Sequence, residues 1–311
     1  MNPLFKEIRS LSTERTNEAT DRIDVMSTLE ILQCINAEDA KVPGAVGEEL
    51  TRIGEAVDLV VRAFTDGGRL FYVGAGTSGR LGIVDASECP PTFGVTPDLV
   101  QAFIAGGPDA VFTAKEGAED RREDGAAVIH EHDVTTHDVV CGIAASGRTP
   151  FVRGALDACA ERGIPTILVT TNSRENLREL GVTADVIIAP QVGPEVLAGS
   201  TRMKSGTAQK LVLNMLTTAA MIRCGKTYGN IMVDLQLTNA KLRERAKNIV
   251  MTVAGVGYEQ ASLLLDETKG DVKSALIMAI AGCSSADARL HLRSAGGFTR
   301  LAIESALRSS A

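Results

Sequence analysis

The chain has 311 residues, of which 44% are hydrophobic and 23% charged, and its formal net charge is −7. This composition is typical of a globular protein with room for one large α/β domain and a small appendage. Aromatic residues make up only 4% and tryptophan is absent, so neither an open stacking platform for sugars nor one for single-stranded nucleic acid is expected. The negative charge also argues against nucleic-acid binding.

Two further features bear on the compartment. No apolar run reaches the roughly 20 residues that cross a membrane, and the N-terminal residues lack the charged-then-apolar layout of a signal peptide. The six cysteines are scattered without a C-x-x-C pair, which is typical of free thiols in a reducing environment. We therefore expect a cytoplasmic protein without membrane segments.

The first 70 residues are expected to be an irregular arm followed by two helices. Residues 12–20 (STERTNEAT) are polar and show no periodicity. Ser27 is a suitable cap for a helix that runs to about residue 36. Apolar residues then recur at helical spacing over about 46–64, which predicts a second helix.

Beyond residue 68, short apolar runs alternate with helical patterns. The expected strands are 69–74, 100–105, 138–144, 165–170 and 185–189, and the expected helices are about 79–86, 107–114, 119–131, 150–162 and 173–180. This alternation predicts an α/β fold with a parallel sheet and helices on both faces. Ligands of such sheets bind at the carboxyl ends of the strands.

From about Met203 onward the strands are expected to cease. One long apolar helix is predicted from about 203 to 223 and another over 234–255. Residues 256–311 show three short helical patterns divided by breaks that contain glycine or serine. We therefore expect a small helical domain at the C-terminal end.

Three clusters of glycine, serine and threonine fall at or just beyond expected strand ends. They are GAGTSG (74–79), ASGRT (145–149) and GSTRMKSG (199–206), and each opens a helix. Free amides at a helix N-terminus, combined with hydroxyl donors, are typical of a phosphate site. Such residues are also ordinary caps and turn formers, but three clusters at corresponding positions of one sheet favour a shared anion ligand.

The first cluster also matches G-x-G-x-x-G, the dinucleotide fingerprint. That fingerprint requires an acidic residue about 20 positions later, at the end of the second strand, to bind the ribose. The second expected strand ends in Gly106-Gly107, without a carboxylate. We therefore expect no nicotinamide or other cofactor, and no pattern of metal ligands is present.

Two groups of carboxylates are candidates for proton transfer. Glu88 lies in DASECPPTFG, where the two prolines are expected to end the helix and hold Glu88 at a defined terminus, aimed into the crevice at the strand ends. A carboxylate there opposes the helix dipole, which makes a functional role more attractive. Glu116 and Glu119 lie in KEGAED at the start of the next helix, where acidic residues also have a purely structural explanation.

These motifs resemble those of a known family. The segments GAGTSGR, DASECPPTFG, IAGG, EGAED, SGRTP, AGSTRMKSGTAQK and YGNIMVDLQLTNAKL are similar to those of the N-acetylmuramic acid 6-phosphate etherases, and the resemblance extends from about residue 12 to 300. One departure is in the arm, where that family tends to read T-E-R-x-N-P and this chain has Glu18 after Asn17.

The resemblance implies a sugar isomerase (SIS) fold, a three-layer α/β/α sandwich with a central parallel sheet. It implies a phosphosugar-binding domain over 1–250 with an N-terminal helical arm, a helical domain over 251–311, and a homodimer. The implied reaction cleaves the lactyl ether of N-acetylmuramic acid 6-phosphate in cell-wall recycling and gives N-acetylglucosamine 6-phosphate and D-lactate. The family is also related to the glucokinase regulatory protein, which binds phosphosugars without catalysis.

By motif, the resemblance implies Glu88 as the catalytic acid and Glu119, rather than Glu116, as the second catalytic carboxylate. The residues expected to bind the substrate and its phosphate are Gly76, Thr77, Ser78, Ser146, Gly147, Ser200 and Thr201.

A metal-free mechanism is consistent with these residues. In the ring-opened sugar the C1 aldehyde acidifies the C2 hydrogen, and the lactyl ether at C3 is β to it. Glu119 is expected to remove the C2 proton or activate water, and Glu88 to protonate the leaving lactate, before water adds across the double bond. The alternatives are a phosphosugar isomerase, which releases no lactate, and a non-catalytic phosphosugar sensor.

Overall fold

The computed structural model describes residues 11–235, 237 and 240–310 of the chain. The chain divides into two compact units, one of Met1–Ser87 with Asp98–Thr217 and one of Glu88–Pro97 with Thr218–Ala311. The functional assignment of residues 1–250 to phosphosugar binding and of 251–311 to a separate helical domain stays a prediction.

The first unit contains a five-stranded parallel sheet with all five strands where the sequence predicts them. They are β1 (Leu70–Gly74), β2 (Val100–Ile104), β3 (Val139–Ile143), β4 (Thr166–Val169) and β5 (Val186–Ile188), in the order β2-β1-β3-β4-β5. The direction of the connections changes between β1 and β3, which are paired with Tyr72 opposite Cys141. The carboxyl ends of β1 and β3 therefore lie side by side at a topological switch point.

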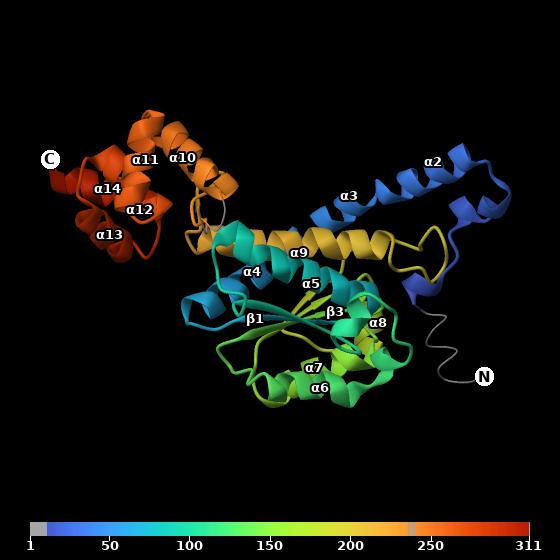
Figure 1. The fold of residues 1–311 in the computed structure, drawn as a ribbon. Helices are drawn as coiled ribbons and strands as arrows, with labels where there is room; N and C mark the ends of the chain where they lie inside the picture. Colours follow the sequence, from blue (N-terminus) through green and yellow to red (C-terminus); the bar gives the residue numbers. More distant parts are fainter. Residues whose placement is uncertain (1–10, 236, 238–239, 311) are drawn as a thin grey trace. The chain divides into compact units, whose positions relative to one another are not determined.

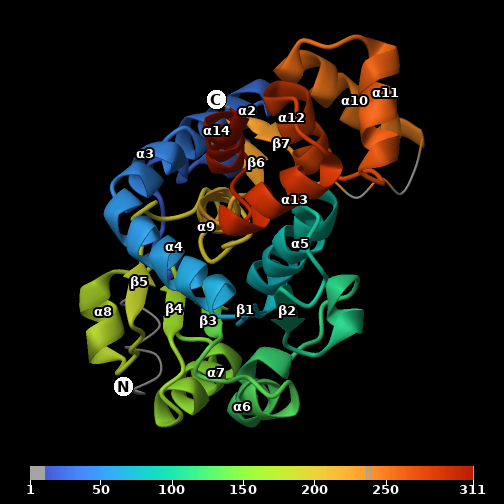
Figure 2. The same cartoon turned by 90° about the vertical axis from the view of Figure 1, so that its left-hand side faces the viewer.

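Helices cover both faces of this sheet and make the expected three-layer sandwich (Figures 1 and 2). α6 (Arg122–Glu131) and α7 (Pro150–Glu161) cover one face. α4 (Leu50–Thr65), α5 (Gly76–Phe93) and α9 (Lys204–Arg223) cover the other, and α8 (Arg174–Glu179) lies beside β5.

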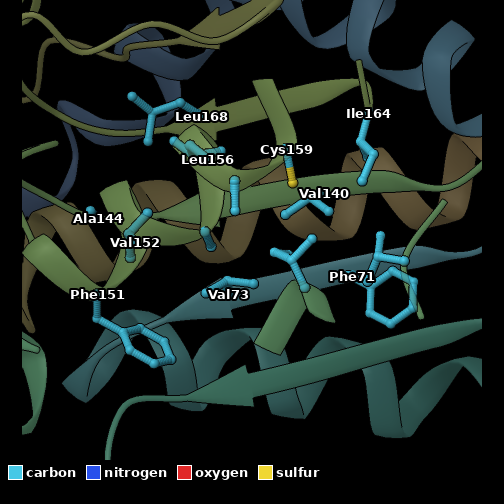
Figure 3. Close-up of a cluster of buried hydrophobic side chains, with 14 of the residues drawn as sticks. Phe71, Val73, Val140, Ala144, Phe151, Val152, Leu156, Cys159, Ile164 and Leu168 are labelled. Atoms are coloured by element: carbon cyan, nitrogen blue, oxygen red, sulfur yellow. The ribbon is translucent and has the colours of Figure 1, made fainter. Parts of the chain in front are cut away.

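The strands are continuous apolar runs in the sequence because the sheet is buried on both faces, one of which packs against α6 and α7. Strands buried on both faces need apolar residues at consecutive positions. Every residue of β1 and of β3 is buried. Figure 3 shows side chains from β1, β3 and β4 packed against those of α7. The cluster includes Phe71, Val73, Val140, Phe151, Val152, Leu156, Cys159 and Leu168.

The N-terminal arm carries three single-turn helices, Ser12–Glu14, Glu18–Thr20 and Ile23–Val25, before α2 (Thr28–Asp39). Ser27 caps α2 as predicted, within a reciprocal capping box with Glu30. The helix expected over 46–64 is interrupted, because α3 (Val42–Gly47) ends before α4 begins. Glu49 lies at this break and turns inward to accept hydrogen bonds from Arg174 and from the amide of Ala189.

Two expected helices in the first unit differ from the structure. Residues 107–114 form only a short 3₁₀ helix, Pro108–Val111, because the guanidinium of Arg80 takes the carbonyls of Ala110 and Val111 that a longer helix would use. Residues 119–131 form a 3₁₀ turn, Ala118–Asp120, followed by α6.

The second unit is mainly helical. Its helices are α10 (Ala240–Ala254), α11 (Tyr258–Glu267), α12 (Val272–Ala281), α13 (Ser285–Ser294) and α14 (Thr299–Ser310). Over residues 256–310, which the structure describes, the tail thus has four helices rather than three. The expectation that strands cease after 203 is wrong, because β6 (Thr227–Tyr228) and β7 (Ile231–Met232) form an antiparallel pair around the positive φ of Gly229. Within the described ranges, no helix has the length and apolarity to span a membrane.

Candidate active site

The three loops that the sequence singles out meet at one cavity of about 360 Å³. Its walls come from the start of α5, the segment between β3 and α7, and the loop before α9. Five of the predicted substrate-binding residues line it, namely Gly76, Thr77, Ser78, Ser146 and Thr201, whereas Gly147 and Ser200 do not. The parallel sheet brings these loops together because their strands end at the same edge.

The first loop is closely packed where β1 passes into α5. A Cβ atom on Gly74 would lie 2.7 Å from the amide nitrogen of Gly79, and one on Gly79 would lie 2.6 Å from Ile104. The glycines therefore allow the turn itself, and the 18-residue helix that follows directs its positive N-terminal end at the cavity.

Ser78 is the buried hydroxyl of this loop. Its Oγ donates a hydrogen bond to Oε1 of Gln209 in α9 at 2.9 Å. The Nε2 atom of Gln209 is buried and has no hydrogen-bond partner among the described residues. Turning this amide by 180° would let Nε2 donate to Ser78 and would free the serine hydrogen for a ligand.

The second loop is tied to the end of β4. The carbonyl of Ala145 accepts hydrogen bonds from the hydroxyls of Thr170 and Thr171, and that of Ser146 accepts one from the Asn172 amide at 3.0 Å. All three donors are buried. A Cβ on Gly147 would lie 2.3 Å from Leu177, so this glycine serves the packing of the loop.

α7 begins in this loop with an N-terminus that no side chain caps. Thr149 precedes the helix and lines the cavity, but its side chain makes no capping bond. Arg148 also lines the cavity and is the one basic residue among the described residues that do so. The start of α7 therefore offers the cavity amide donors and a nearby positive charge.

The third loop, residues 199–206, differs from its prediction because the amides at the start of α9 are already paired. The carboxylate of Glu195 accepts hydrogen bonds from the amides of Lys204 and Ser205, each at 2.9 Å. The expectation that the N-terminus of α9 binds an anion ligand is therefore wrong, because a buried carboxylate of the same chain occupies it. Thr201 is the residue of this loop that lines the cavity together with Gly199.

Lys204 is also withdrawn from the cavity. Its ammonium is 1% exposed and pairs with the carboxylate of Glu38 in α2 at 2.6 Å. Burial raises the pKa of Glu38, but the hydrogen bonds from Lys204 and Lys41 outweigh it and lower that pKa to about 2. This buried ion pair joins α2 to the start of α9.

Glu119 lines the cavity, beside the hydroxyl-bearing loops. It lies in the 3₁₀ turn Ala118–Asp120, eight residues after Val111, whose carbonyl accepts a hydrogen bond from Arg80. Its pKa is raised, chiefly by partial loss of water and then by the negative charges of Asp120 and Glu116.

Glu116 occupies a different position. It lines a smaller neighbouring cavity of about 150 Å³ and not the main one, whereas Glu119 borders both. Arg80 and Lys115 line this smaller cavity as well. Glu119 thus shares the main cavity with residues of all three predicted loops, whereas Glu116 shares the smaller one with Ala75 and Gly76 of the first loop.

Glu88 is exposed on α5 and is not among the residues that line the main cavity. The prediction that two prolines end its helix is wrong, because α5 continues through Pro90 and Pro91 to Phe93. The fixed φ of proline matches a helix, so the helix loses hydrogen bonds there without having to stop. Glu88 is ten residues beyond Ser78, which corresponds to about 15 Å along a helix axis.

Sequence reasoning missed several residues of this site. Thr13 and Glu14, from the arm, line the cavity together with Arg148 and Thr149. Arg148 and Thr149 belong to the ASGRT motif, so their position in this motif could have identified them from the sequence. The polar arm has no periodicity that would place it there.

The chain is similar to several known proteins. The family model for the glucokinase regulatory protein N-terminal SIS domain matches residues 52–160. The chain is 58% identical to the N-acetylmuramic acid 6-phosphate etherase of Salinibacter ruber over 97% of this chain and 96% of that protein. It is 49% identical to the one of Clostridium beijerinckii, over 96% of this chain and 97% of that protein. Among solved structures, the phosphoheptose isomerase GmhA from Neisseria gonorrhoeae is similar with a TM-score of 0.47 and 17% identity, covering 62% of this chain and 99% of that chain.

Proposed function

This chain belongs to the N-acetylmuramic acid 6-phosphate etherase family, and from that premise we propose that it cleaves the D-lactyl ether of N-acetylmuramic acid 6-phosphate. The products are N-acetylglucosamine 6-phosphate and D-lactate. The reaction is a carbon–oxygen lyase step in the recycling of cell-wall amino sugars.

The composition of the main cavity supports this proposal most directly. A single cavity combines hydroxyls from three loops with a carboxylate whose pKa is raised. The N-termini of α5 and α7, the hydroxyls and Arg148 supply donors for a phosphate without a metal ion. Binding energy from that remote group holds the reacting carbons against the carboxylate.

Glu119 is the base of this mechanism. Its carboxylate removes the proton from C2 of the ring-opened sugar, where the C1 aldehyde makes the proton acidic. The electron pair forms the C2–C3 double bond, the C3–oxygen bond breaks, and lactate leaves. A raised pKa makes Glu119 a stronger base than an ordinary glutamate, as proton abstraction from carbon requires.

Glu88 is proposed as the acid that protonates the departing lactate oxygen. This role rests on the family motif DASECPPT, in which Glu88 stands. Water then adds across the double bond, with hydroxyl at C3 and a proton at C2. The remaining substrate ligands are Gly76, Thr77, Ser78, Ser146, Gly147, Ser200 and Thr201, with Gly147 and Ser200 acting through the shape of their loops.

The proposal is tested by incubating the protein with N-acetylmuramic acid 6-phosphate and measuring D-lactate. We expect turnover by the wild type and a loss of about 10²- to 10⁴-fold in kcat for Glu119→Gln. This variant should still bind N-acetylglucosamine 6-phosphate, because the phosphate loops are intact. Interconversion of aldose and ketose phosphates without lactate would instead identify an isomerase, and binding without turnover a sensor.

The chain is further proposed to act as a cytoplasmic homodimer. α2 exposes Leu29 and Leu32, at 65% and 56%, on a surface that a second copy would cover. All six cysteines are free, as the reducing cytoplasm requires. Light scattering should give twice the 32.8 kDa mass of the chain, and a monomer at micromolar concentration would contradict this proposal.

A further inference from the structure

Two polar groups at the cavity are buried and have no hydrogen-bond partner within the described part of the chain. Among the described residues, only three buried side-chain nitrogen or oxygen atoms lack one, namely Oγ1 of Thr13, Nε2 of Gln209 and Oγ1 of Thr299. Buried polar groups in folded proteins are nearly always paired, so each exception needs an explanation. Thr13 lines the cavity itself, and Gln209 contacts it through Ser78.

Thr13 is held at the cavity by the main chain and by its neighbours in the arm. Its carbonyl accepts a hydrogen bond from the amide of Gly199 at 3.0 Å. Farther along the arm, Thr20 donates to the carbonyl of Val196 at 2.9 Å and Asn17 to that of Pro194. The arm and the loop before α9 therefore form one wall, and the Thr13 side chain is only 3% exposed in it.

The partner that Thr13 lacks must be able to accept a hydrogen bond within the cavity. The hydroxyls of Thr77, Ser146 and Thr201 line the same space, near the positive ends of α5 and α7. A phosphoryl group is the ligand that uses many neutral donors together, because its oxygens accept hydrogen bonds and donate none at full ionisation.

We propose that the Thr13 hydroxyl is a ligand of the phosphoryl group, so that the N-terminal arm forms part of the binding site. This inference rests on the proposed phosphosugar site and extends it to a residue outside the three loops. Gln209 completes the arrangement when its amide turns, since Nε2 then donates to Ser78 and the serine hydrogen is released to the same group.

The proposal predicts opposite effects on folding and on binding. Thr13→Val keeps the shape of the side chain and removes an oxygen that has no hydrogen-bond partner among the described residues. The thermal midpoint of the variant should therefore be equal to that of the wild type or higher, because no hydrogen bond is lost. Affinity for a phosphorylated ligand should fall about tenfold or more, the effect of deleting a hydrogen bond to a charged group.

Thr299→Val is the matched control. Thr299 is also buried, at 1% exposure, and also has an unpaired hydroxyl, but it does not line the cavity. Its replacement should leave the thermal midpoint equal or higher and the affinity unchanged. Thr13→Ser, which keeps the hydroxyl, should bind within about threefold of the wild type.

The test is calorimetric titration of the full chain with N-acetylglucosamine 6-phosphate and, separately, with inorganic phosphate, alongside thermal unfolding of each variant. We expect Thr13→Val to weaken both ligands and Thr299→Val neither. If Thr13→Val binds both as tightly as the wild type, or weakens only the sugar phosphate, the phosphoryl contact is refuted. Loss of affinity together with a lower thermal midpoint would indicate a structural role and would also overturn it. A wild type that binds these ligands but releases no lactate would refute the proposed reaction and leave this inference standing.

Discussion

Replacing Glu38 by glutamine should destabilise the first unit far more than an ordinary surface change. The variant leaves the Lys204 ammonium, which is 1% exposed, without its counterion. Removing one partner of a buried ion pair typically costs about 3–5 kcal/mol. The pKa of Glu38 gives a similar figure, because a fall from 4.5 to about 2 corresponds to about 3–4 kcal/mol at 1.4 kcal/mol per pKa unit.

The assay is urea unfolding followed by circular dichroism, with Glu55→Gln as the matched control. Glu55 pairs with Arg52 at 2.7 Å on the surface of α4, with both side chains about half exposed, so its loss should cost less than about 0.5 kcal/mol. The double variant Glu38→Gln with Lys204→Met should recover much of the loss, since no unpaired charge remains. A loss for Glu38→Gln as small as that for Glu55→Gln would refute this reasoning.

The contribution of the Glu38–Lys204 ion pair to stability should also depend on pH. The pKa of Glu38 is depressed in the folded chain, so its contribution to stability is complete above about pH 4.5 and is lost as the pH falls toward 2. The wild type should therefore lose stability in that window more steeply than Glu38→Gln. Equal slopes for the two proteins would contradict the assignment.

Two further predictions concern Glu119. In the pH profile of kcat/KM, activity should fall on the acid side with an apparent pKa above 4.5, the ordinary value for glutamate, because the raised pKa of Glu119 keeps this base protonated to higher pH. An apparent pKa at or below 4.5 would contradict the role of Glu119. Arg80 lines the smaller cavity together with Glu119 and binds the carbonyls of Ala110 and Val111. Arg80→Met should release these carbonyls, loosen the wall that contains Glu119, and lower kcat about tenfold or more with little change in affinity for N-acetylglucosamine 6-phosphate. Unchanged kcat in that variant would show that this wall is held by other contacts.

The sheet was predictable because its signal is local. Strands buried on both faces must be apolar at consecutive positions, and runs such as LFYV (70–73) show this directly. Glycine and serine clusters after such strands predict loops at one edge, and five of the seven expected ligand residues do line one cavity.

The remaining features depend on contacts between distant parts of the chain. Glu195 caps α9, the carbonyl of Thr13 accepts a hydrogen bond from the amide of Gly199, and Arg80 ends a helix thirty positions away. The sequence around each of these residues contains no pattern that predicts its partner. The extent of α5 was misjudged for another reason. Proline disfavours a helix without forbidding it, so Pro90 and Pro91 remain helical.

The central claim is elimination and addition at the cavity that contains Glu119, and it is tested most directly in deuterated water. N-acetylmuramic acid 6-phosphate is incubated with the wild-type chain, and D-lactate is measured together with deuterium at C2 of the sugar product. We expect one deuterium at C2 for each lactate released, and neither product from Glu119→Gln at a comparable rate. Lactate released with the original hydrogen retained at C2 would contradict the mechanism, and the absence of lactate would contradict the function.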